Sequence, residues 1–454
     1  MTDTFKIDLK DKPLMQNGTF YVAVFGCQMN VYDGDRIRDL LQASGFVEVA
    51  EPQLAKIVVF VTCAVRAKAE NRVFKQIETW THQGLIKKDT IIALGGCVGS
   101  ELGEKLVLQN KKINIVFGPR TVHRLPSLIS KFISSGKSCV DVEASSLDKF
   151  DALPSPGARG FSAFVTIMEG CSNKCTYCIV PYTRGEEISR PVEDILNECR
   201  EYLNNGVKEI HLLGQNVNSY HGIFKDGSEC DFATLLYEVA ALPNVKRIRF
   251  TTSNPMDFTD DIVKAIKDLP VISDQIHVPI QSGSDRILGL MHRRYTVEEY
   301  KTLVKKLREA RPSVLISSDF IVGFPGESDD DFEETMKAVK EIAFDQSFSF
   351  IYSKRPGTPA AEYPDDTSFE IKQQRLYRLQ DELEKSTQRN GQALIGSVQE
   401  VLVEGISRKD ESELKSRASN GRITVFKGNK DLIGQMVKVK ITGVIAHTLR
   451  AEII

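Results

Sequence analysis

Between residues 161 and 352, six short apolar segments alternate with five segments that have the hydrophobic period of a helix. The apolar segments cover 161–168, 208–213, 246–251, 275–280, 314–322 and 346–352. The helical segments between them cover about 191–204, 231–241, 259–268, 296–310 and 329–343. This alternation predicts a barrel or partial barrel of parallel strands, and its functional residues are expected where the strands end.

The region before this barrel alternates strands and helices on a smaller scale. Its three apolar segments cover 20–25, 56–61 and 90–94. The helix-length segments between them cover about 31–43 and 65–82. Short runs rich in β-branched and aromatic residues are typical of buried parallel strands. We therefore expect an open, doubly wound α/β domain over 18–140, followed by a linker with prolines and glycines over 141–160.

The last part of the chain changes to the period of a strand with one buried face. Its apolar and polar residues alternate in four segments that turn residues separate: VQEVLVEG, GRITVFKG, MVKVKITG and TLRAEII. The pattern predicts an antiparallel sheet, most simply a small β-barrel, over 391–454. A charged helix over 370–390 is expected to join it to the central domain, which we place at 161–385. The predicted fold class is therefore α/β with three parts.

Composition limits the kind of protein this can be. A chain of 454 residues with 41% hydrophobic and 26% charged residues is globular and long enough for roughly two to four domains. Its 59 basic and 61 acidic residues nearly cancel. No segment predicts a membrane span or a signal peptide, so we expect a cytoplasmic protein without a membrane partner. In that compartment the nine cysteines are better candidates for metal ligands or reactive thiols than for disulfides.

Three cysteines form a C-x3-C-x2-C pattern directly after the first strand of the predicted barrel. They are Cys171, Cys175 and Cys178, within EGCSNKCTYC. Three thiolates on one tight loop can hold three irons of a 4Fe–4S cluster and leave the fourth iron open to a substrate or cofactor. The alternative is a structural zinc ion, which needs a fourth ligand; His123 and Cys199 are distant in sequence.

A second set of cysteines ends the three strands of the N-terminal domain. Cys27, Cys63 and Cys97 follow VAVFG, VVFVT and IALGG. Since the carboxyl ends of neighbouring parallel strands share one edge of a sheet, these thiols are expected to converge on a second cluster with an open iron. Gly26, Gly95 and Gly96 would allow the backbone to approach it closely. The alternative is that the three cysteines are ordinary core residues.

The cysteine loop resembles that of the radical S-adenosylmethionine superfamily. In that superfamily the open iron binds the amino and carboxylate groups of S-adenosylmethionine, and an electron from the cluster releases a 5′-deoxyadenosyl radical. Tyr177 matches the aromatic position that lies beside the adenine in these proteins. The order of the three parts is similar to that of the methylthiotransferases, which have a three-cysteine domain, a radical core and a TRAM domain.

Five further segments resemble the MiaB-type branch of that family, which modifies tRNA. They are VPYTRGEEISRP at 180–191, LLGQNVNSYHG at 212–222, HVPIQSGSDRIL at 277–288, DFIVGFPGE at 319–327 and VEGISRK at 403–409. The chain departs from the family pattern at Val61, at Gly99 and Ser100, and at Asn254, where Asn, Ala-Gln and His are usual. None of these positions is a cluster ligand.

The resemblance implies an enzyme that methylthiolates C2 of an N6-isopentenyl (dimethylallyl) adenosine beside the anticodon of tRNA. It further implies two 4Fe–4S clusters, S-adenosylmethionine as radical source and methyl donor, an external electron donor and a sulfur source. The alternatives are a threonylcarbamoyl-adenosine or a ribosomal-protein aspartate as substrate, against which the Gly-Glu-Glu step at 185–187 weighs. A third hypothesis is an electron-transfer protein with two clusters, which would need neither an open iron nor a TRAM-like tail.

Several polar residues at strand ends are candidates for binding cofactor or substrate. Gly214 and Gln215 end the second strand of the barrel, Ser253 the third and Gln281 the fourth, and we expect them to contact S-adenosylmethionine. They can also be simple helix caps. For contact with cofactor or RNA the candidates are Arg184, Glu186 and Arg190, although such charges are often only solvated.

The C-terminal domain is the candidate for binding RNA. From residue 391 onward it has ten Lys and Arg against seven Asp and Glu, a local excess of three positive charges. Such an excess suits contacts to the phosphates of a tRNA anticodon stem-loop, and small β-barrels are common RNA platforms. A charged solvent-facing surface on an ordinary barrel would have the same composition.

Overall fold

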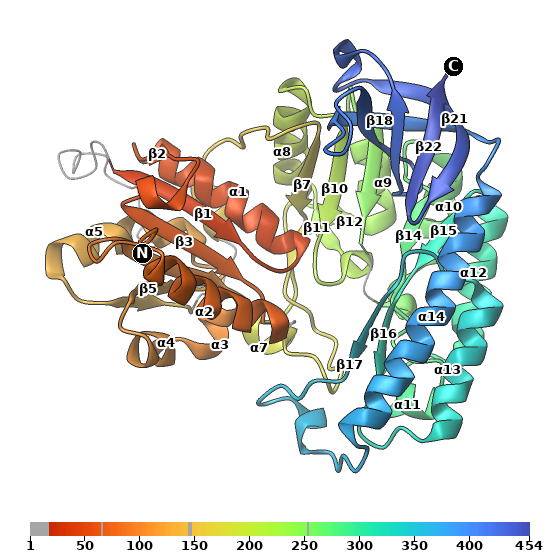
Figure 1. The fold of residues 1–454 in the computed structure, drawn as a ribbon, viewed down its shortest axis with the longest axis horizontal. Coiled ribbons are helices and arrows are strands. Elements are labelled where there is room, and N and C mark those ends of the chain that lie inside the picture. Colours follow the sequence, from red (N-terminus) through yellow and green to blue (C-terminus); the bar gives the residue numbers. More distant parts are fainter. Residues whose placement is uncertain (1–17, 65–66, 144–147, 252–253) are drawn as a thin grey trace. The chain divides into compact units, whose positions relative to one another are not determined.

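The computed structural model describes residues 18–454 except 65–66, 144–147 and 252–253 (Figure 1). The chain forms two compact units. The first consists of the residues up to Gly157 together with Val180–Ile188, and the second of Ala158–Ile179 and Ser189–Ile454. The chain therefore enters the second unit, returns to the first for nine residues, and then enters the second again.

The first unit is built on a parallel sheet of six strands in the order β2-β1-β3-β4-β5-β6. The three predicted strands are confirmed as β1 (Thr19–Val24), β3 (Ile57–Thr62) and β4 (Ile91–Gly96). Three more strands were not predicted: β2 (Val47–Glu48), β5 (Ile113–Phe117) and β6 (Cys139–Asp141). All six residues of β3 are buried, as expected for a central strand with helices on both faces.

Helices connect these strands. Those of the first unit are α1 (Gln28–Ala43), α2 (Ala67–His82), α3 (Cys97–Leu102), α4 (Glu104–Gln109), α5 (Leu125–Ser135), α6 (Asp148–Ala152) and α7 (Val180–Arg184), with short 3-10 turns at Pro52–Leu54 and Val122–Arg124. The helix α6 lies inside the segment expected to be a linker. The helix α7 belongs to the segment that returns from the second unit, and it packs against α3.

The second unit contains the predicted partial barrel. Its strands pair in parallel as β7 (Ser162–Thr166), β10 (Glu209–Leu213) and β13 (Arg247–Phe250), as β14 (Gln275–His277) with β15 (Leu315–Ser317), and as β16 (Asp319–Val322) with β17 (Phe348–Ile351). Single parallel bridges, Thr251 to His277 and Gln281 to Phe320, connect the pieces. The shorter strands β8 (Met168–Glu169), β9 (Ile188–Ser189), β11 (His221–Ile223) and β12 (Glu229–Asp231) lie in the connections.

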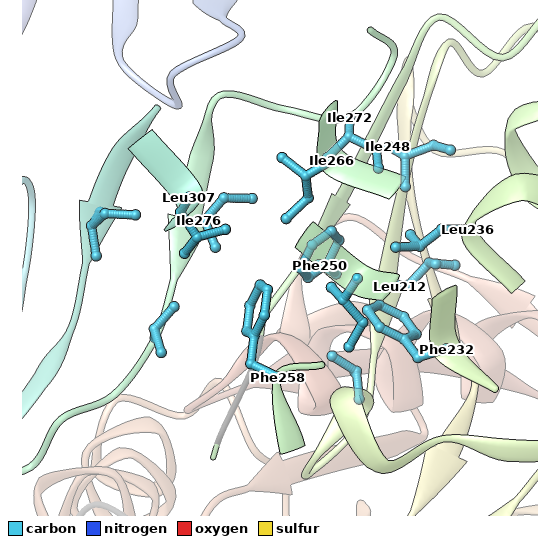
Figure 2. Close-up of a cluster of buried hydrophobic side chains, with 14 of the residues drawn as sticks. Leu212, Phe232, Leu236, Ile248, Phe250, Phe258, Ile266, Ile272, Ile276 and Leu307 are labelled. Atoms are coloured by element: carbon cyan, nitrogen blue, oxygen red, sulfur yellow. The ribbon is translucent and has the colours of Figure 1, made fainter. Parts of the chain in front are cut away.

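The five predicted helices of this barrel are confirmed, and they cover its outside. They are α8 (Val192–Asn204), α9 (Phe232–Ala240), α10 (Asp260–Asp268), α12 (Val297–Ala310) and α13 (Asp329–Ile342); α11 (Asp285–Leu290) is shorter, and 3-10 turns lie at Val217–Ser219, Pro255–Asp257 and Pro359–Glu362. Figure 2 shows how Phe232 and Leu236 of α9 meet Leu212 and Phe250 of the strands in one buried cluster. Burial of this apolar layer holds the strands at the spacing that positions their ends.

The C-terminal part of the second unit is a closed barrel in the order β18-β19-β20-β22-β21. Its strands are β18 (Val398–Ile406), β19 (Glu413–Ala418), β20 (Ile423–Lys427), β21 (Met436–Ile445) and β22 (Thr448–Ile453), with a 3-10 turn at Lys430–Leu432; the helix α14 (Phe369–Ala393) precedes it. The predicted small antiparallel barrel is confirmed with one exception, because β20 and β22 pair in parallel. A ring of five strands cannot alternate direction all the way round, so at least one pair must be parallel.

This closed barrel is joined to the strands of the partial barrel by buried arginines. Arg249 donates to Glu209 Oε2 at 2.9 Å and to the carbonyl of Ala418 at 2.7 Å. Arg247 donates to the carbonyls of Arg417 and Glu400, each at 3.0 Å. Burial alone would raise the pKa of Glu209, but the two guanidinium groups outweigh it and lower that pKa to about 2. The carboxylate therefore stays ionised between its two partners.

Replacing Arg249 with Ala is expected to destabilise this unit strongly. The change leaves the buried Glu209 carboxylate with a weaker set of partners and removes the donor for a carbonyl of the closed barrel, which costs about 3–5 kcal/mol. Urea denaturation followed by circular dichroism measures the loss. Arg200→Ala is the control, because Arg200 pairs with Glu193 in a partly exposed position where a loss of at most about 1 kcal/mol is expected. Equal losses in the two variants would contradict the prediction.

Among the residues that the structure describes, no helix combines the length and the apolar character required to cross a membrane.

Candidate functional sites

The first candidate site lies where the strand order of the six-stranded sheet reverses. The chain runs from β1 outward to β2 on one side and to β3, β4 and β5 on the other, so the switch point lies between β1 and β3. Cys27 caps the helix that follows β1, Cys63 follows β3, and Cys97 begins the helix that follows β4. In open parallel sheets, ligands bind in the crevice at the carboxyl ends of the strands at this point.

The three thiols of this site are close to one another. The Cys27 thiol shares a hydrogen bond with Cys63, which is the main reason that its pKa is lowered to about 6; burial opposes this and Arg184 adds to it. Burial raises the pKa of Cys97, with Arg184 acting in the opposite direction. Gly26 has a φ of 115°, and a Cβ placed on it would lie 2.4 Å from that of Cys63. A glycine is therefore required for the two strand ends to approach this closely.

This set of donors fits an iron–sulfur cluster. It consists of three cysteines whose thiolates can each bind a different iron, which leaves one iron for another ligand. Within the described part of the chain, no three His, Cys, Asp or Glu side chains are arranged to hold a single metal ion. Cluster ligands stand farther apart than the ligands of one ion, because each binds its own iron.

Charged side chains that are almost fully buried surround the first site. Arg184 Nε lies 3.4 Å from Cys97 Sγ, and its Nη2 donates to Asp33 Oδ2 at 3.1 Å. Lys149 Nζ donates to the other oxygen of Asp33 at 3.4 Å and to the carbonyl of Pro119 at 3.1 Å. Sequence reasoning singled out Arg184 but missed Asp33 and Lys149. For Lys149 the reason is that nothing in a linker segment distinguishes a buried lysine from an exposed one.

The second candidate site is the loop between β8 and α7, which carries Cys171, Cys175 and Cys178. Thr176 fixes this loop against the C-terminal end of α11: its backbone N–H donates to Met291 O at 3.1 Å and its hydroxyl to Leu290 O at 2.9 Å. Its own carbonyl accepts from Ala360 N at 2.9 Å. The three cysteines themselves are only half-buried. The loop is thus held at its centre while its thiols remain accessible to a cluster.

Tyr177 and Arg293 stand beside this cysteine loop. Arg293 Nη1 lies 3.6 Å from Cys175 Sγ, and its other nitrogens donate to Tyr295 and to the carbonyl of Pro279. Burial raises the pKa of Tyr177, although the nearby Arg293 acts against it. The ring of Tyr177 packs on an apolar cluster that includes Met291 and Phe324. Arg293 was not predicted, since nothing in the sequence connects it to a cysteine more than a hundred residues away.

Of the predicted strand-end residues, Gln215 is hydrogen-bonded to this loop. Gln215 Oε1 accepts from the backbone N–H of Gly170 at 2.6 Å, directly before Cys171. A Cβ on Gly214 would lie 2.4 Å from Met168, so only glycine fits there. Gln281 has a left-handed φ of 70°, a conformation that costs a non-glycine residue about 1–3 kcal/mol and is often found at functional sites. Ser253 lies outside the described residues.

The same end of β10 also has buried acceptors without a partner. The side-chain oxygens of Asn216 and Asn218 are buried and have no hydrogen-bond partner among the residues that the structure describes. Their amide nitrogens are used, by Asp257 at 2.6 Å and by the carbonyl of Asn254 at 3.1 Å. Buried acceptors are normally satisfied, so these two oxygens fit a ligand with N–H or O–H donors, which S-adenosylmethionine has.

The three charged candidates after the cysteine loop have different surroundings. Arg184 is in the first site, as described above. Glu186 has an exposed side chain, and its carbonyl accepts from Arg120 at 2.6 Å. Arg190 is buried and donates to Glu198 at 2.7 Å and to the carbonyl of Thr166 at 2.6 Å. The three side chains therefore have different partners, and their contact with cofactor or RNA remains a prediction.

The basic residues of the closed barrel are divided between its surface and its interior. Arg422 is fully buried and bonds to Asp345 and to the carbonyl of Thr387, so it does not face solvent. Lys415 and Arg417 both pair with Glu404. The exposed ones are Arg408, Lys409, Lys427, Lys430, Lys438 and Lys440. These six are the ones available to phosphates.

Comparison with known proteins covers both sites. Family models match residues 165–339 as the radical SAM superfamily, 19–118 as the uncharacterized protein family UPF0004 and 392–454 as a TRAM domain. A tRNA-2-methylthio-N(6)-dimethylallyladenosine synthase of Vibrio vulnificus is 49% identical over 434 residues, which is 95% of this chain and 92% of that protein. The protein of the same name from Photorhabdus laumondii is 49% identical over 96% of this chain and 91% of its own length.

Solved structures resemble this chain in fold at low sequence identity. The radical S-adenosylmethionine methyltransferase TsrM from Kitasatospora setae has a TM-score of 0.56 and 15% identity, covering 76% of this chain and 75% of that one. The cobalamin-dependent S-adenosylmethionine radical enzyme OxsB has a TM-score of 0.51 and 14% identity, covering 82% of this chain and 56% of that one. Both likenesses support the assigned architecture, an α/β domain followed by a partial barrel.

Proposed function

The chain belongs to the family of tRNA-2-methylthio-N(6)-dimethylallyladenosine synthases, and we propose that it adds a methylthio group to C2 of N6-dimethylallyladenosine beside the anticodon of tRNA. The observation that carries this proposal is the presence of two separate three-cysteine sites in one chain. One lies at the switch point of a parallel sheet and the other follows the first strand of a partial barrel. Each provides three thiolates, which leaves room for a further ligand on the cluster.

The chemistry explains why a chain of this family has two such sites. The C2 hydrogen of an adenine is bound to an unactivated aromatic carbon, and no side-chain base removes it usefully. When bound, the cofactors supply what the protein lacks. S-adenosylmethionine supplies the radical and the methyl group, and the clusters supply an electron and a binding place for the sulfur. The chain's own residues bind, orient and shield these groups.

We assign a role to each site on this basis. Cys171, Cys175 and Cys178 would hold the cluster that supplies the electron for S-adenosylmethionine, and Tyr177 would bind the adenine of that cofactor. The buried oxygens of Asn216 and Asn218 would accept hydrogen bonds from the cofactor, while Gln215 fixes the loop by accepting from Gly170. The auxiliary cluster, which is held by Cys27, Cys63 and Cys97, carries the sulfur. Two clusters per chain are thus part of the proposal.

The closed barrel binds the substrate RNA. Its six exposed basic residues contact phosphates of the anticodon stem-loop, which supplies affinity but not sequence recognition. The target base lies in a single-stranded loop, where a nucleotide can be turned out of its stack at low cost. An external electron donor and a sulfur source complete the reaction.

The test of this function is the composition of tRNA nucleosides in a strain that lacks the gene. Mass spectrometry is expected to show that the methylthiolated nucleoside disappears and that N6-dimethylallyladenosine accumulates in its place, with both effects reversed by a plasmid copy. An unchanged nucleoside profile, or the loss of a methylthiolated threonylcarbamoyl-adenosine instead, would contradict the proposal.

A further inference from the structure

Three charged side chains from distant parts of the chain meet beside Cys97. Arg184 comes from α7, Asp33 from α1 and Lys149 from α6, and they are 3%, 2% and 1% exposed. Asp33 lies between the two cations, with one carboxylate oxygen directed to each of them. The guanidinium group of Arg184 is then directed by its Nε toward Cys97 Sγ, at 3.4 Å.

The trio carries two positive charges and one negative charge. Burying charges is costly unless they are paired, so a buried guanidinium group gains from an anion in direct contact. The thiolates of Cys27, Cys63 and Cys97 would provide it, because a cluster bound by thiolates alone on the protein side is anionic. Within the trio, the Arg184 guanidinium is the group in direct contact with one of these sulfur atoms.

We propose that Arg184, held in place by Asp33 and Lys149, is a positioning residue that raises the reduction potential of the auxiliary cluster. The inference rests on the proposed function, since it requires that cluster to be present. A hydrogen bond to a ligand sulfur and a buried positive charge both stabilise the reduced, more negative state of a cluster. Arg184 supplies both at Cys97, and Asp33 fixes the direction in which the guanidinium points.

The competing interpretation gives Arg184 a purely structural role as the residue that anchors α7 on the first unit. Under that interpretation its removal would lower stability but leave the electronic properties of the cluster unchanged. A reduction potential therefore separates the two interpretations, whereas enzymatic activity or protein yield would not.

The experiment is a redox titration followed by electron paramagnetic resonance. It uses the full chain with Cys171, Cys175 and Cys178 all replaced by Ala, so that only the auxiliary cluster contributes to the signal. In this background Arg184→Gln is expected to shift the midpoint potential to a more negative value. Arg184→Lys keeps the charge without the fork of donors and should shift it less. Lys149→Met leaves Arg184 in place but removes a buried positive charge beside Asp33, and should also make the potential more negative.

The matched control is Arg36→Gln, which removes a buried arginine of the same unit that pairs with Asp39 on α1. Its midpoint potential is expected to equal that of the parent. If Arg184→Gln does not retain the cluster, the shifts in Arg184→Lys and Lys149→Met decide the question. Unchanged potentials in the variants that retain the cluster would overturn this inference alone. A parent protein that binds no auxiliary cluster would overturn the proposed function as well.

Discussion

Replacing Cys27, Cys63 and Cys97 together with Ala is expected to separate two reactions that the intact chain performs together. The variant should hold about half the iron of the parent, because one of two clusters remains. It should still cleave S-adenosylmethionine when reduced, since the other three cysteines lie in the second unit with their own loop. It should transfer no methylthio group to tRNA. Iron content, 5′-deoxyadenosine and methylthiolated nucleoside are measured on the same sample.

The chain provides a matched control for this experiment. Cys139, Cys199 and Cys230 are buried, and none of them belongs to either site. Replacing these three with Ala removes the same number of sulfur atoms from protein cores, with a packing cost only. Iron content and product are expected to stay at the parent level. A folded Cys27, Cys63 and Cys97 triple variant that still makes methylthiolated product would show that the first site does not carry the sulfur.

Replacing Cys175 alone with Ala is expected to abolish all radical chemistry. The loop then has two thiolates for a cluster that needs three, and the sulfur that Arg293 contacts is removed. Iron should again fall to about half, but now 5′-deoxyadenosine should disappear together with the product. The two variants thus share one iron content and differ in cleavage. Retained cleavage in Cys175→Ala would refute the assignment of this loop, and Cys199→Ala serves as the single-substitution control.

The architecture was predictable where local pattern and tertiary role agree. The segment IVVFVT of β3 is apolar throughout because both of its faces are covered, and its helix neighbours have clear periods. The strand β19 was missed because its sequence is ELKSRA. Its buried residues include Glu413 and Ser416, whose polar side chains are accommodated by partners from other strands, Arg450 and the carbonyl of Thr424.

The site was predictable in part for the same reason. A cysteine that ends a strand is a local feature, and three of them point to a shared edge as soon as the sheet is recognised. The contact between Arg184 and Cys97 is not local, since it joins residues 87 positions apart through a helix that returns from the other unit. No period or spacing reports such a contact. The burial of Lys149 is hidden in the same way, because its partner Asp33 precedes it by 116 residues.

The return of Val180–Ile188 to the first unit has a consequence for how these proteins can be cut and recombined. A gene fragment that ends at Gly157 would encode the whole six-stranded sheet but leave out Arg184, which donates to Asp33 and contacts Cys97. A chimera that exchanges N-terminal domains between two relatives would need to include this nine-residue segment, so that Arg184 comes from the same protein as Asp33 and Cys97. Exchanging the first unit between relatives therefore requires two separate gene segments, one that ends at Gly157 and one that encodes Val180–Ile188.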